Sequence, residues 1–416
     1  MNEYEFINLF KAIFQCTTTF KEAITNENAF TRNRKMSFFQ ALCFLLDMNK
    51  TSLSNRLNKF FGFLGKTTAI SQQAFSKLRA KFDHSPFVKL FYAMVKKEYN
   101  GSHQTGLWKG RHIFAVDGVR FKLPNTKQLL EKFGVFGSLD SVSAGASVLF
   151  DVIHGWVLDV QFAMAKMNER TECLKHIHFL TTHFKEIANN CIILFDRGYP
   201  SQKLFIELIR SGIQFVIRCP SNSLVAIAKA PIGVSIITLK GVYRVRVIKF
   251  RLRSGEIATL VSNVFDLSEE DFQKLYSLRW GIETMFDTLK NKLNIEKVSG
   301  KTLNSVMQDF WASLVLMNTA ALFNNIASKE LKKKLSGTKN KNEQKIAISK
   351  LIVTLRDHSF FPMMCANPIY LEFNLIKIIP EIVRNRVSVI PGRSFPRNIP
   401  KGRRKIRNNL KSCLAA

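Results

Sequence analysis

The chain has 416 residues, of which 62 are Lys or Arg and 31 are Asp or Glu, so its formal net charge at pH 7 is +31. Hydrophobic residues make up 46% and charged residues 22%, a globular composition that excludes a disordered or low-complexity protein. At roughly 100–200 residues per domain, the length allows two or three domains. Folding does not require such an excess of positive charge, which indicates an anionic partner: nucleic acid first, a membrane surface second.

Targeting and redox signals are those of an intracellular protein. The longest apolar runs, 36–48 and 310–323, are shorter than the roughly 20 residues that cross a bilayer, and they predict buried core helices. The acidic N-terminus lacks the basic start and apolar core of a secretory signal. The seven cysteines are scattered without a CxxC pair, which argues against a disulfide framework or a zinc ribbon. We therefore expect no membrane segment.

The first segment, 1–105, is predicted to be a helical DNA-binding domain. Within it, 51–82 predicts two helices around a Gly-containing turn, the second beginning after Ser71 as N-cap. This second helix places apolar side chains on one side (Phe75, Leu78 and Phe82) and polar ones on the other (Gln72, Gln73, Ser76, Lys77, Arg79 and Lys81). The pattern suits a helix-turn-helix whose second helix enters a major groove. It suits equally an amphipathic surface helix with a solvated basic face.

From residue 111 the pattern changes to strands. Strands are predicted at 111–123, 146–153, 156–162, 191–195 and 214–219, with helices at 168–187 and 202–211. The continuous apolar run 191–195 is typical of a strand buried on both faces. The predicted order is three strands, a helix, a strand, a helix and a strand, which is the order of an RNase H-like α/β core. In that fold the first and fourth strands form the central parallel pair. We assign this catalytic core to 106–325.

The remaining segments are an insertion in this core and a basic C-terminal region. Basic and apolar residues alternate over 243–253, so 220–262 predicts an inserted β subdomain with a DNA-facing cationic face, or an exposed solubilising strand. A slip of parity at Val247 and Ile248 predicts a bulge or a twist of the strand. A capping box at Ser268 predicts a long helix to about residue 293, followed by an apolar helix over 303–327. Residues 326–416 are predicted to be basic helices and a tail, with ten Lys or Arg and no acid from residue 382 onward.

Two aspartates stand at predicted strand ends. Asp117 closes the first strand and is followed by Gly118, and Asp196 closes the fourth. If these strands are adjacent and parallel, both carboxylates emerge side by side at one end of the sheet. Two unpaired carboxylates that close repel each other, and divalent cations remove the conflict. Hard oxygen ligands favour Mg²⁺ or Mn²⁺.

A third acid, Glu283, lies in the predicted long helix. At about 100° per residue, Tyr276, Arg279, Glu283 and Lys290 share one narrow face. Such a face suits a metal ion beside a phosphate, because the Glu can bind the metal while the Arg and Lys bind phosphate oxygens. The alternative is a solvated face with ion pairs at i,i+4 and i,i+7.

These four residues fit the pattern Y-x2-R-x3-E-x6-K without exception. On this signature the chain resembles bacterial insertion-sequence transposases of the DDE type, and among them the IS-four family. Val116-Asp117-Gly118 and Asp196-Arg197-Gly198-Tyr199 look like the two aspartate motifs of that group. The resemblance extends from about residue 110 to 325 and includes the β insertion.

The resemblance implies a chemistry. Asp117, Asp196 and Glu283 would hold two divalent ions, Mg²⁺ with Mn²⁺ as a substitute. One would activate water or a DNA 3′-OH, and the other would stabilise the leaving oxygen of an in-line attack on phosphorus. Tyr276, Arg279 and Lys290 would grip the DNA backbone at the transposon terminus. The partners would be the double-stranded transposon ends and target DNA, bound by a homodimer on paired ends, without a small-molecule cofactor, in the cytoplasm at the nucleoid.

The remaining His, Cys and acidic residues are predicted to have structural roles. Cys173, His176 and His178, with His183 nearby, could suggest zinc, but positions i and i+2 of a helix point apart, which favours a satisfied core or surface role. Glu169 starts a predicted helix, where an acid complements the helix dipole. Four further acids could each replace one of the three acids, but none combines a strand end with a matching motif: Asp140, Asp151, Asp159 and Asp309. Asp287, one turn from Glu283 on the same predicted helix, is interpreted as a helix-surface acid.

Two rival functions stay open at this point. A non-catalytic helix-turn-helix regulator would bind DNA with indifference to Mg²⁺. A domesticated DDE nuclease would cut DNA without joining it to a target. The intact Asp117, Asp196 and Glu283 favour an active transposase.

Overall fold

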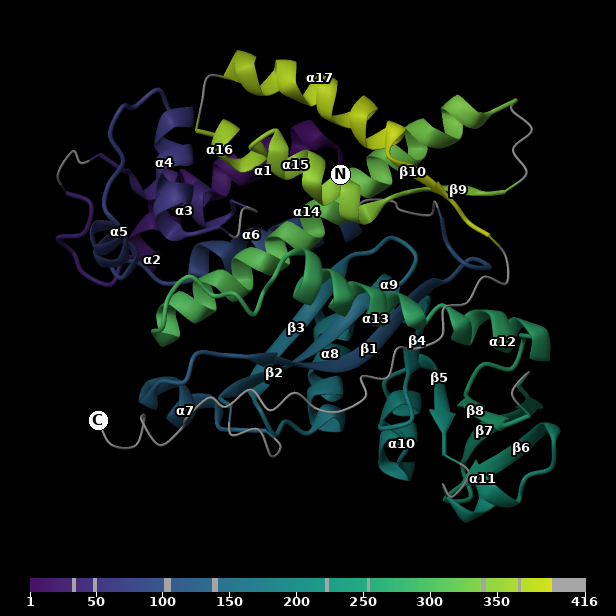
Figure 1. Cartoon of the computed structure of the whole chain (residues 1–416). Coiled ribbons are helices and arrows are strands. Elements are labelled where there is room, and N and C mark those ends of the chain that lie inside the picture. Colours follow the sequence, from purple (N-terminus) through teal and green to yellow (C-terminus); the bar gives the residue numbers. More distant parts are fainter. Residues whose placement is uncertain are drawn as a thin grey trace. The chain divides into compact units, whose positions relative to one another are not determined.

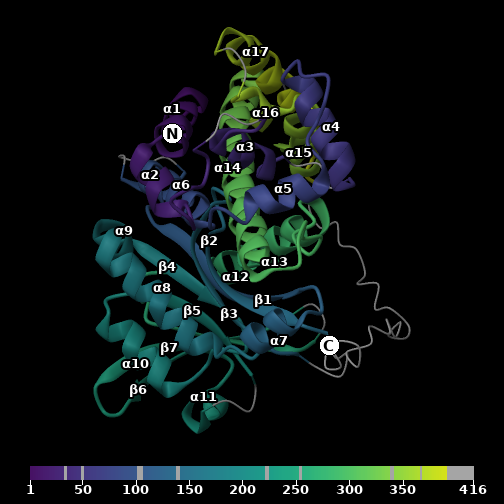
Figure 2. The ribbon, with the colours of Figure 1, turned by 90° about the vertical axis from the view of Figure 1, so that its left-hand side faces the viewer.

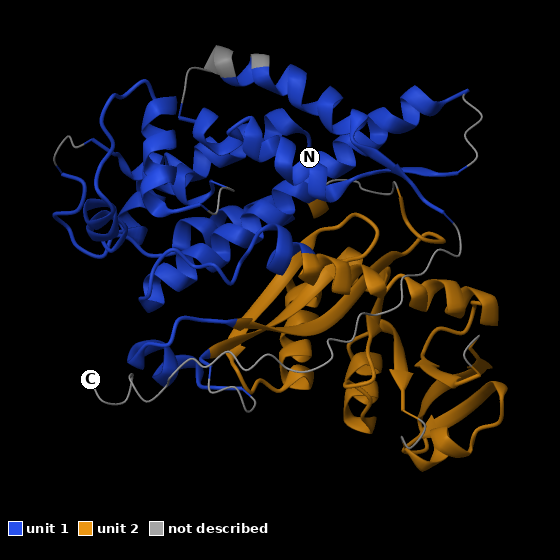
Figure 3. Ribbon diagram, in the orientation of Figure 1, with its two compact units in different colours: residues 1–97, 122–142, 288–416 blue, residues 98–121, 143–287 orange. Residues whose placement is uncertain are grey.

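The computed structural model describes residues 1–31, 35–47, 51–100, 106–136, 141–220, 224–252, 255–337, 342–365 and 368–390. The chain forms two compact units that do not follow its order (Figure 3). Unit 1 contains residues 1–97, 122–142 and 288–416, and unit 2 contains 98–121 and 143–287. The functional division into 1–105, 106–325 and 326–416 stays a prediction, and the basic tail beyond residue 390 lies outside the described residues.

Unit 2 is built on an eight-stranded sheet of order β3-β2-β1-β4-β5-β8-β7-β6 (Figure 1). Its strands are β1 (His112–Lys122), β2 (Ser143–Asp151), β3 (Val157–Met164), β4 (Cys191–Phe195), β5 (Gln214–Cys219), β6 (Gly233–Leu239), β7 (Tyr243–Arg251) and β8 (Ile257–Ser262). Its helices are α8 (Glu169–His183), α9 (Lys185–Asn189), α10 (Gln202–Arg210), α11 (Val225–Lys229), α12 (Glu269–Ser277) and α13 (Trp280–Asp287).

The five predicted core strands pair in the expected order. β1 runs parallel to β4, with Val116 opposite Phe195, and β4 runs parallel to β5. All five residues of β4 are buried, as its apolar run predicted. The two crossovers that contain α8 and α10 bring these helices onto the same face of the sheet, since such connections are right-handed, whereas α12 and α13 lie on the other side (Figure 2). The core is a mixed α/β fold in which the predicted central parallel pair is confirmed.

The insertion continues the main sheet. β8 pairs antiparallel with β5, and β7 pairs with β8 in an unbroken register that includes Val247 and Ile248. Of the two predicted alternatives, the bulge is therefore wrong. Both of these side chains are buried although they point to opposite faces, which shows that β7 is covered on both faces here and explains the slip of parity.

Two of the cations on β7 bind the protein's own backbone. Arg246 Nη1 donates to the carbonyl of Leu267 at 2.8 Å and also reaches the carbonyls of Val264 and Phe265. Lys249 Nζ donates to the carbonyls of Ala228 and Ala230 at 2.8 and 2.6 Å. These two side chains therefore fasten neighbouring loops, and the DNA-facing role stays a prediction for the other cations of this strand.

The predicted helix from Ser268 to about residue 293 is interrupted. The capping box is present, since Ser268 and Asp271 each bind the other's backbone N–H. However, α12 ends at Ser277, α13 begins at Trp280, and the segment η1 (Thr288–Lys292), which belongs to unit 1, is π-helical. The rotation per residue is not uniform across these three segments, so the helical spacing alone does not place the four signature residues on one face. The contacts of their side chains show which of them lie together.

The described part of unit 1 is helical apart from a small β9–β10 pair. Its elements are α1 (Glu3–Phe14), α2 (Thr17–Ala23), α3 (Phe38–Leu45), α4 (Leu53–Phe63), α5 (Gln72–Arg79), α6 (Ser85–Tyr99, the last two residues in unit 2), α7 (Lys127–Phe133), η1, α14 (Leu303–Leu335), β9 (Gln344–Ile346), α15 (Ile348–Asp357), α16 (Phe360–Met363), α17 (Pro368–Arg384) and β10 (Arg386–Ser388). By length and composition α14 could cross a membrane, but 83% of its apolar window is buried inside the protein. Residues 310–323 form the predicted core helix.

Phenylalanines fill the core of unit 1. Phe44 contacts Phe60 and Phe75 with ring centroids 5.4 and 4.6 Å apart, which packs α3 against α4 and α5. Phe323 of α14 meets Phe360 of α16 at 5.1 Å. Edge-to-face pairs of this kind add to the free energy gained by burial. The abundance of Phe is therefore explained by packing.

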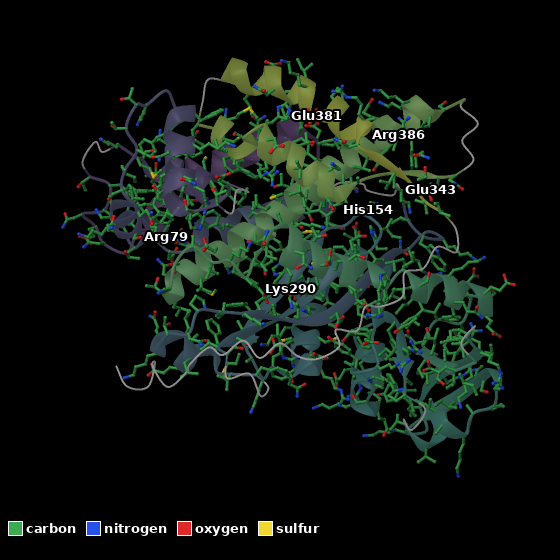
Figure 4. The ribbon with its side chains drawn as sticks, viewed as in Figure 1. Arg79, His154, Lys290, Glu343, Glu381 and Arg386 are labelled. Carbon is green, nitrogen blue, oxygen red and sulfur yellow. The ribbon has the colours of Figure 1, made fainter. Side chains whose placement is uncertain are left out.

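The predicted helix pair within 51–82 is present as α4 and α5, with Ser71 capping α5. Gln72, Gln73, Ser76 and Lys77 are exposed, as the sequence predicted. Arg79 is a correction, because it is only 5% exposed and binds residues around the start of α14 (Figure 4). Its guanidinium is thus unavailable to read a groove.

Candidate active site

Asp117 and Asp196 come directly after paired residues of two neighbouring parallel strands. The parallel register of β1 and β4 ends at the pair Val116 and Phe195, and each aspartate is the next residue. β1 itself continues to Lys122, so Asp117 lies within the strand and does not close it as predicted. The two aspartates are nevertheless neighbours, because the pairing of β1 with β4 ends one residue before each of them.

The environment of Asp117 is electrostatically mixed. Burial raises its pKa to about 6. The N–H of Gly118, 2.8 Å from Asp117 Oδ1, and the charge of Arg279 lower this pKa, whereas the charges of Asp196 and Glu169 raise it. Two further carboxylates are thus close enough to influence Asp117. Burial is the largest of these influences, and the neighbouring carboxylates add to it.

Arg279 is the central cation of this group. Its Nη2 lies 2.6 Å from Glu283 Oε1 and its Nη1 lies 3.6 Å from Asp117 Oδ2. Its guanidinium also stands 5.8 Å from the ring centroid of Tyr276, and the Tyr276 hydroxyl donates to the carbonyl of Phe195 at 3.4 Å. The structure therefore brings Tyr276, Arg279 and Glu283 together with Asp117, in spite of the interrupted helix.

The hydrogen-bonding capacity of Arg279 is not exhausted. Its Nε and Nη1 are buried without a hydrogen-bond partner among the described residues. Burial opposes the charge of this guanidinium, but Tyr276, Glu283 and Asp196 together raise its pKa above the ordinary value. A cation that is held by several acids and still has unused donors can transfer to another anion, such as a phosphate.

The donor set suits a divalent cation. In the described part of the chain, no three His, Cys, Asp or Glu side chains are close enough to hold a metal as they stand. Asp117 and Glu283 are instead bridged by the Arg279 guanidinium, which supplies the positive charge there. Carboxylate oxygens are the ligands that Mg²⁺ and Mn²⁺ take in proteins. Metal binding at these acids would therefore require the guanidinium to move aside.

Lys290, the last residue of the signature, lies on η1 in unit 1 (Figure 4). The other five predicted site residues all belong to unit 2. The role of Lys290 in binding DNA therefore stays a prediction.

One acid in this region was missed by the sequence reasoning. Glu169, the first residue of α8, lies beside both aspartate motifs. A Cβ atom added to Gly118 would stand 2.8 Å from Glu169 Oε1, and one added to Gly198 would stand 3.4 Å from Glu169 Oε2. Gly118, directly after the first aspartate, was the available signal, because a glycine can mark a place where another group approaches the backbone closely.

The other acids have structural partners. Asp151 accepts hydrogen bonds from Tyr99 at 2.7 Å and from the backbone of His154 at 2.8 Å. Asp159 binds His176 Nδ1 at 2.7 Å, and His176 Nε2 lies 3.0 Å from Ser147 Oγ. His176 thus has the satisfied core role that was predicted against zinc. Asp309 binds Arg79, Asp287 is exposed as expected, and Asp140 lies outside the described residues.

Known proteins match the chain in both sequence and fold. The family model described as "Transposase DDE domain" matches residues 108–319, about half of the chain. A protein of Geobacillus stearothermophilus, named "Probable transposase for insertion sequence element IS5377", is 33% identical over 72 residues. That alignment spans only 17% of this chain and 19% of the relative.

The fold resembles that of the piggyBac transposase, solved as a synaptic complex with hairpin DNA. The TM-score is 0.52 at 12% sequence identity, over 94% of this chain and 87% of the other, which is a likeness of fold alone. The match of the family model covers both aspartates, Glu283 and the strands that carry them. The chain belongs to the transposase DDE domain family.

Proposed function

We propose that this protein is a DNA transposase of the IS-four type, which cleaves the inverted-repeat ends of an insertion sequence and joins them to target DNA. Asp117, Asp196 and Glu283 would be its catalytic acids. The observation that carries the proposal is the placement of Asp117 and Asp196 directly after the last paired residues of β1 and β4, with Glu283 linked to Asp117 through Arg279.

Two divalent cations, Mg²⁺ or Mn²⁺, bound by these three acids would supply activation of the attacking oxygen and stabilisation of the leaving oxygen. Since burial raises the pKa of Asp117 to about 6, this carboxyl is partly protonated just below neutral pH, and cation binding would compete with that proton. The three carboxylates would hold the cations, and they would not read DNA sequence.

The second proposed task of the site is to hold the DNA backbone. Once the carboxylates have cations to bind, Arg279 is released from Asp117 and Glu283 and can donate to phosphate oxygens. Tyr276, beside Arg279, and Lys290 would bind the same terminus. The net charge of +31 would attract DNA to the rest of the surface, with a strong dependence on salt.

The joining of two ends also implies an assembly. Both ends of an element must be present in one complex before they are inserted together, so we propose a homodimer on paired ends. No small-molecule cofactor is needed for this chemistry, because water and a DNA 3′-OH are the nucleophiles.

The test uses labelled duplexes from both flanks of the gene's own locus, incubated with the purified chain and Mg²⁺. Wild type and Asp196→Ala run side by side on a denaturing gel, with EDTA as a metal control. We expect a metal-dependent nick at a repeat boundary that the variant does not make, although the variant still binds the duplex. Binding without cleavage in either metal would favour a regulator, and cleavage without joining would favour a domesticated nuclease.

A further inference from the structure

Glu169 has a position that the requirements of its helix do not explain. It opens α8, but the N-terminus of this helix is already capped by the side chain of Asn168, which accepts hydrogen bonds from the N–H groups of Arg170 and Thr171 at 3.1 and 3.4 Å. The Glu169 carboxylate instead approaches the backbone at Gly118 and Gly198. Its two oxygens thus face the two segments that carry Asp117 and Asp196.

Gly118, the glycine of the first aspartate motif, leaves room for this carboxylate and for Met167. A Cβ at Gly118 would stand 2.8 Å from Glu169 Oε1 and 2.7 Å from Met167 Cε, closer than real Cβ atoms approach another heavy atom. At Gly198 the corresponding distance to Glu169 Oε2 is 3.4 Å, an ordinary van der Waals contact. Glu169 therefore approaches the backbone of both motifs, and the approach requires glycine at the first of them.

A buried hydroxyl supplies a second, independent observation. The Tyr199 side chain is fully buried, and its hydroxyl has no hydrogen-bond partner among the described residues. Burial raises the pKa of Tyr199 well above its ordinary value, and the charges of Asp117, Glu169 and Asp196 raise it further. This unpaired hydroxyl lies within the electrostatic influence of the three carboxylates, and it leaves a buried hydrogen-bonding position unfilled that a bound ligand can satisfy.

Glu169 also borders a cavity. The cavity has a volume of about 270 Å³ and is lined by Arg120, Met167, Asn168, Glu169, Arg170 and Gly198. A DNA phosphate that entered here would be repelled by Glu169 and by the neighbouring aspartates. A divalent cation bound to these carboxylates removes that repulsion, while Arg120 and Arg170 favour the phosphate.

We infer that Glu169 is a fourth carboxylate ligand for the divalent cations, on the Asp117 and Asp196 side of the site. The inference rests on the proposed function, because it assumes that these aspartates bind metal. It assigns to α8 a direct part in the active site, and it gives the glycine directly after Asp117 a role beside the Glu169 carboxylate.

The test measures metal binding by the full-length protein in the absence of DNA. Mn²⁺ is titrated into wild type, Glu169→Gln, Asp196→Ala and the control Glu186→Gln, and free Mn²⁺ is followed by its electron paramagnetic resonance signal. Glu186 is an exposed acid in the first turn of α9, so it repeats the helix-end setting away from the aspartates. Thermal unfolding of each variant in EDTA shows whether it is folded.

We expect Glu169→Gln to bind Mn²⁺ at least about tenfold more weakly than wild type, with Glu186→Gln unchanged. If Asp196→Ala loses Mn²⁺ affinity while a folded Glu169→Gln keeps it, the inference is overturned and the proposed function stands. If wild type and Asp196→Ala bind Mn²⁺ equally, the metal site itself is wrong and the inference fails with it. If Glu169→Gln is unfolded, Glu169→Asp replaces it, and an unchanged affinity in that variant and in Glu169→Ala overturns the inference.

Discussion

Two buried arginines, Arg79 in unit 1 and Arg279 in unit 2, use their guanidinium groups in opposite ways. Arg79 donates to Gln308 Oε1 at 2.8 Å, to Ser299 Oγ at 2.7 Å, and to Asp309 Oδ1 and the carbonyl of Ser305 at 3.1 Å. Each of its three guanidinium nitrogens has a partner. Arg279 makes one short bond, to Glu283, and in the described part of the chain its Nε and Nη1 have no hydrogen-bond partner.

On the proposed function, the difference separates a structural ion pair from one that opens during the reaction. Arg79 and Asp309 are both almost fully buried, and the polar groups around them complete the network, so nothing is gained by opening it. Around Arg279 the side chains of Asp117 and Glu283 keep 21% and 30% of their surface exposed, and the acids outnumber the cation. A divalent cation would stabilise these carboxylates, and a phosphate would stabilise the guanidinium. The proposed reaction supplies both ligands.

The largest effect on stability is expected from Arg79→Ala. The substitution leaves Asp309 buried without its cation, and we expect the free energy of unfolding to fall by about 3–5 kcal/mol. Chemical denaturation measures this change, with Lys77→Ala on the exposed side of α5 as the control. A loss as small as that of the control would show that Arg79 does not fasten α5 to α14.

A smaller and pH-dependent effect is expected from Asp117→Asn. A carboxyl whose pKa is raised from 3.8 to about 6 by folding stabilises the protein below the lower value and loses that contribution as the pH rises through 6. Between pH 4 and pH 8 in EDTA, the asparagine variant should therefore gain on the order of 2 kcal/mol relative to wild type. Denaturation at both pH values, with exposed Asp287→Asn as the control, measures the gain. An equal difference from wild type at both pH values would contradict the raised pKa of Asp117 in the folded protein.

The smallest effect on stability is expected from Arg279→Ala. Since its acidic partners are partly hydrated, the loss should be on the order of 1 kcal/mol, well below that of Arg79→Ala. Its affinity for an end duplex, measured by fluorescence anisotropy, should nevertheless decrease, because a phosphate-binding group is lost. A large loss of stability with unchanged DNA affinity would remove the contrast between the two arginines.

The fold was predictable where a pattern depends on local residues. The run of apolar residues 191–195 predicted β4, and Ser268 and Ser71 marked the starts of α12 and α5. The pairing of β8 with β5 was not predictable, because no local signal distinguishes a strand that extends the main sheet from one in a separate subdomain. The break after Ser277 and the π-helical turn at 288–292 were missed for the same reason, since the sequence pattern there reads as one regular helix.

The site was predictable to the extent that spacing and strand ends determine it. Asp117 and Asp196 follow from the parallel pair, and Tyr276, Arg279 and Glu283 meet although the helix is broken between them. Arg79 was misplaced because the polar side of α5 carries a cation whose acid lies 230 residues away in sequence. Glu169 was assigned only to the helix dipole, because the approach of its carboxylate to the two glycines is visible only in three dimensions.

The central claim is that Glu283, and not a neighbouring acid, completes a metal-dependent site with the two aspartates. Glu283 and Asp287 lie one turn apart on α13, which makes them a matched pair. The most direct measurement compares Mg²⁺-dependent cleavage of an end duplex by Glu283→Ala, Asp287→Ala and wild type at equal DNA binding. The account predicts that cleavage is abolished in Glu283→Ala and retained in Asp287→Ala. Cleavage by Glu283→Ala at the wild-type rate would contradict it.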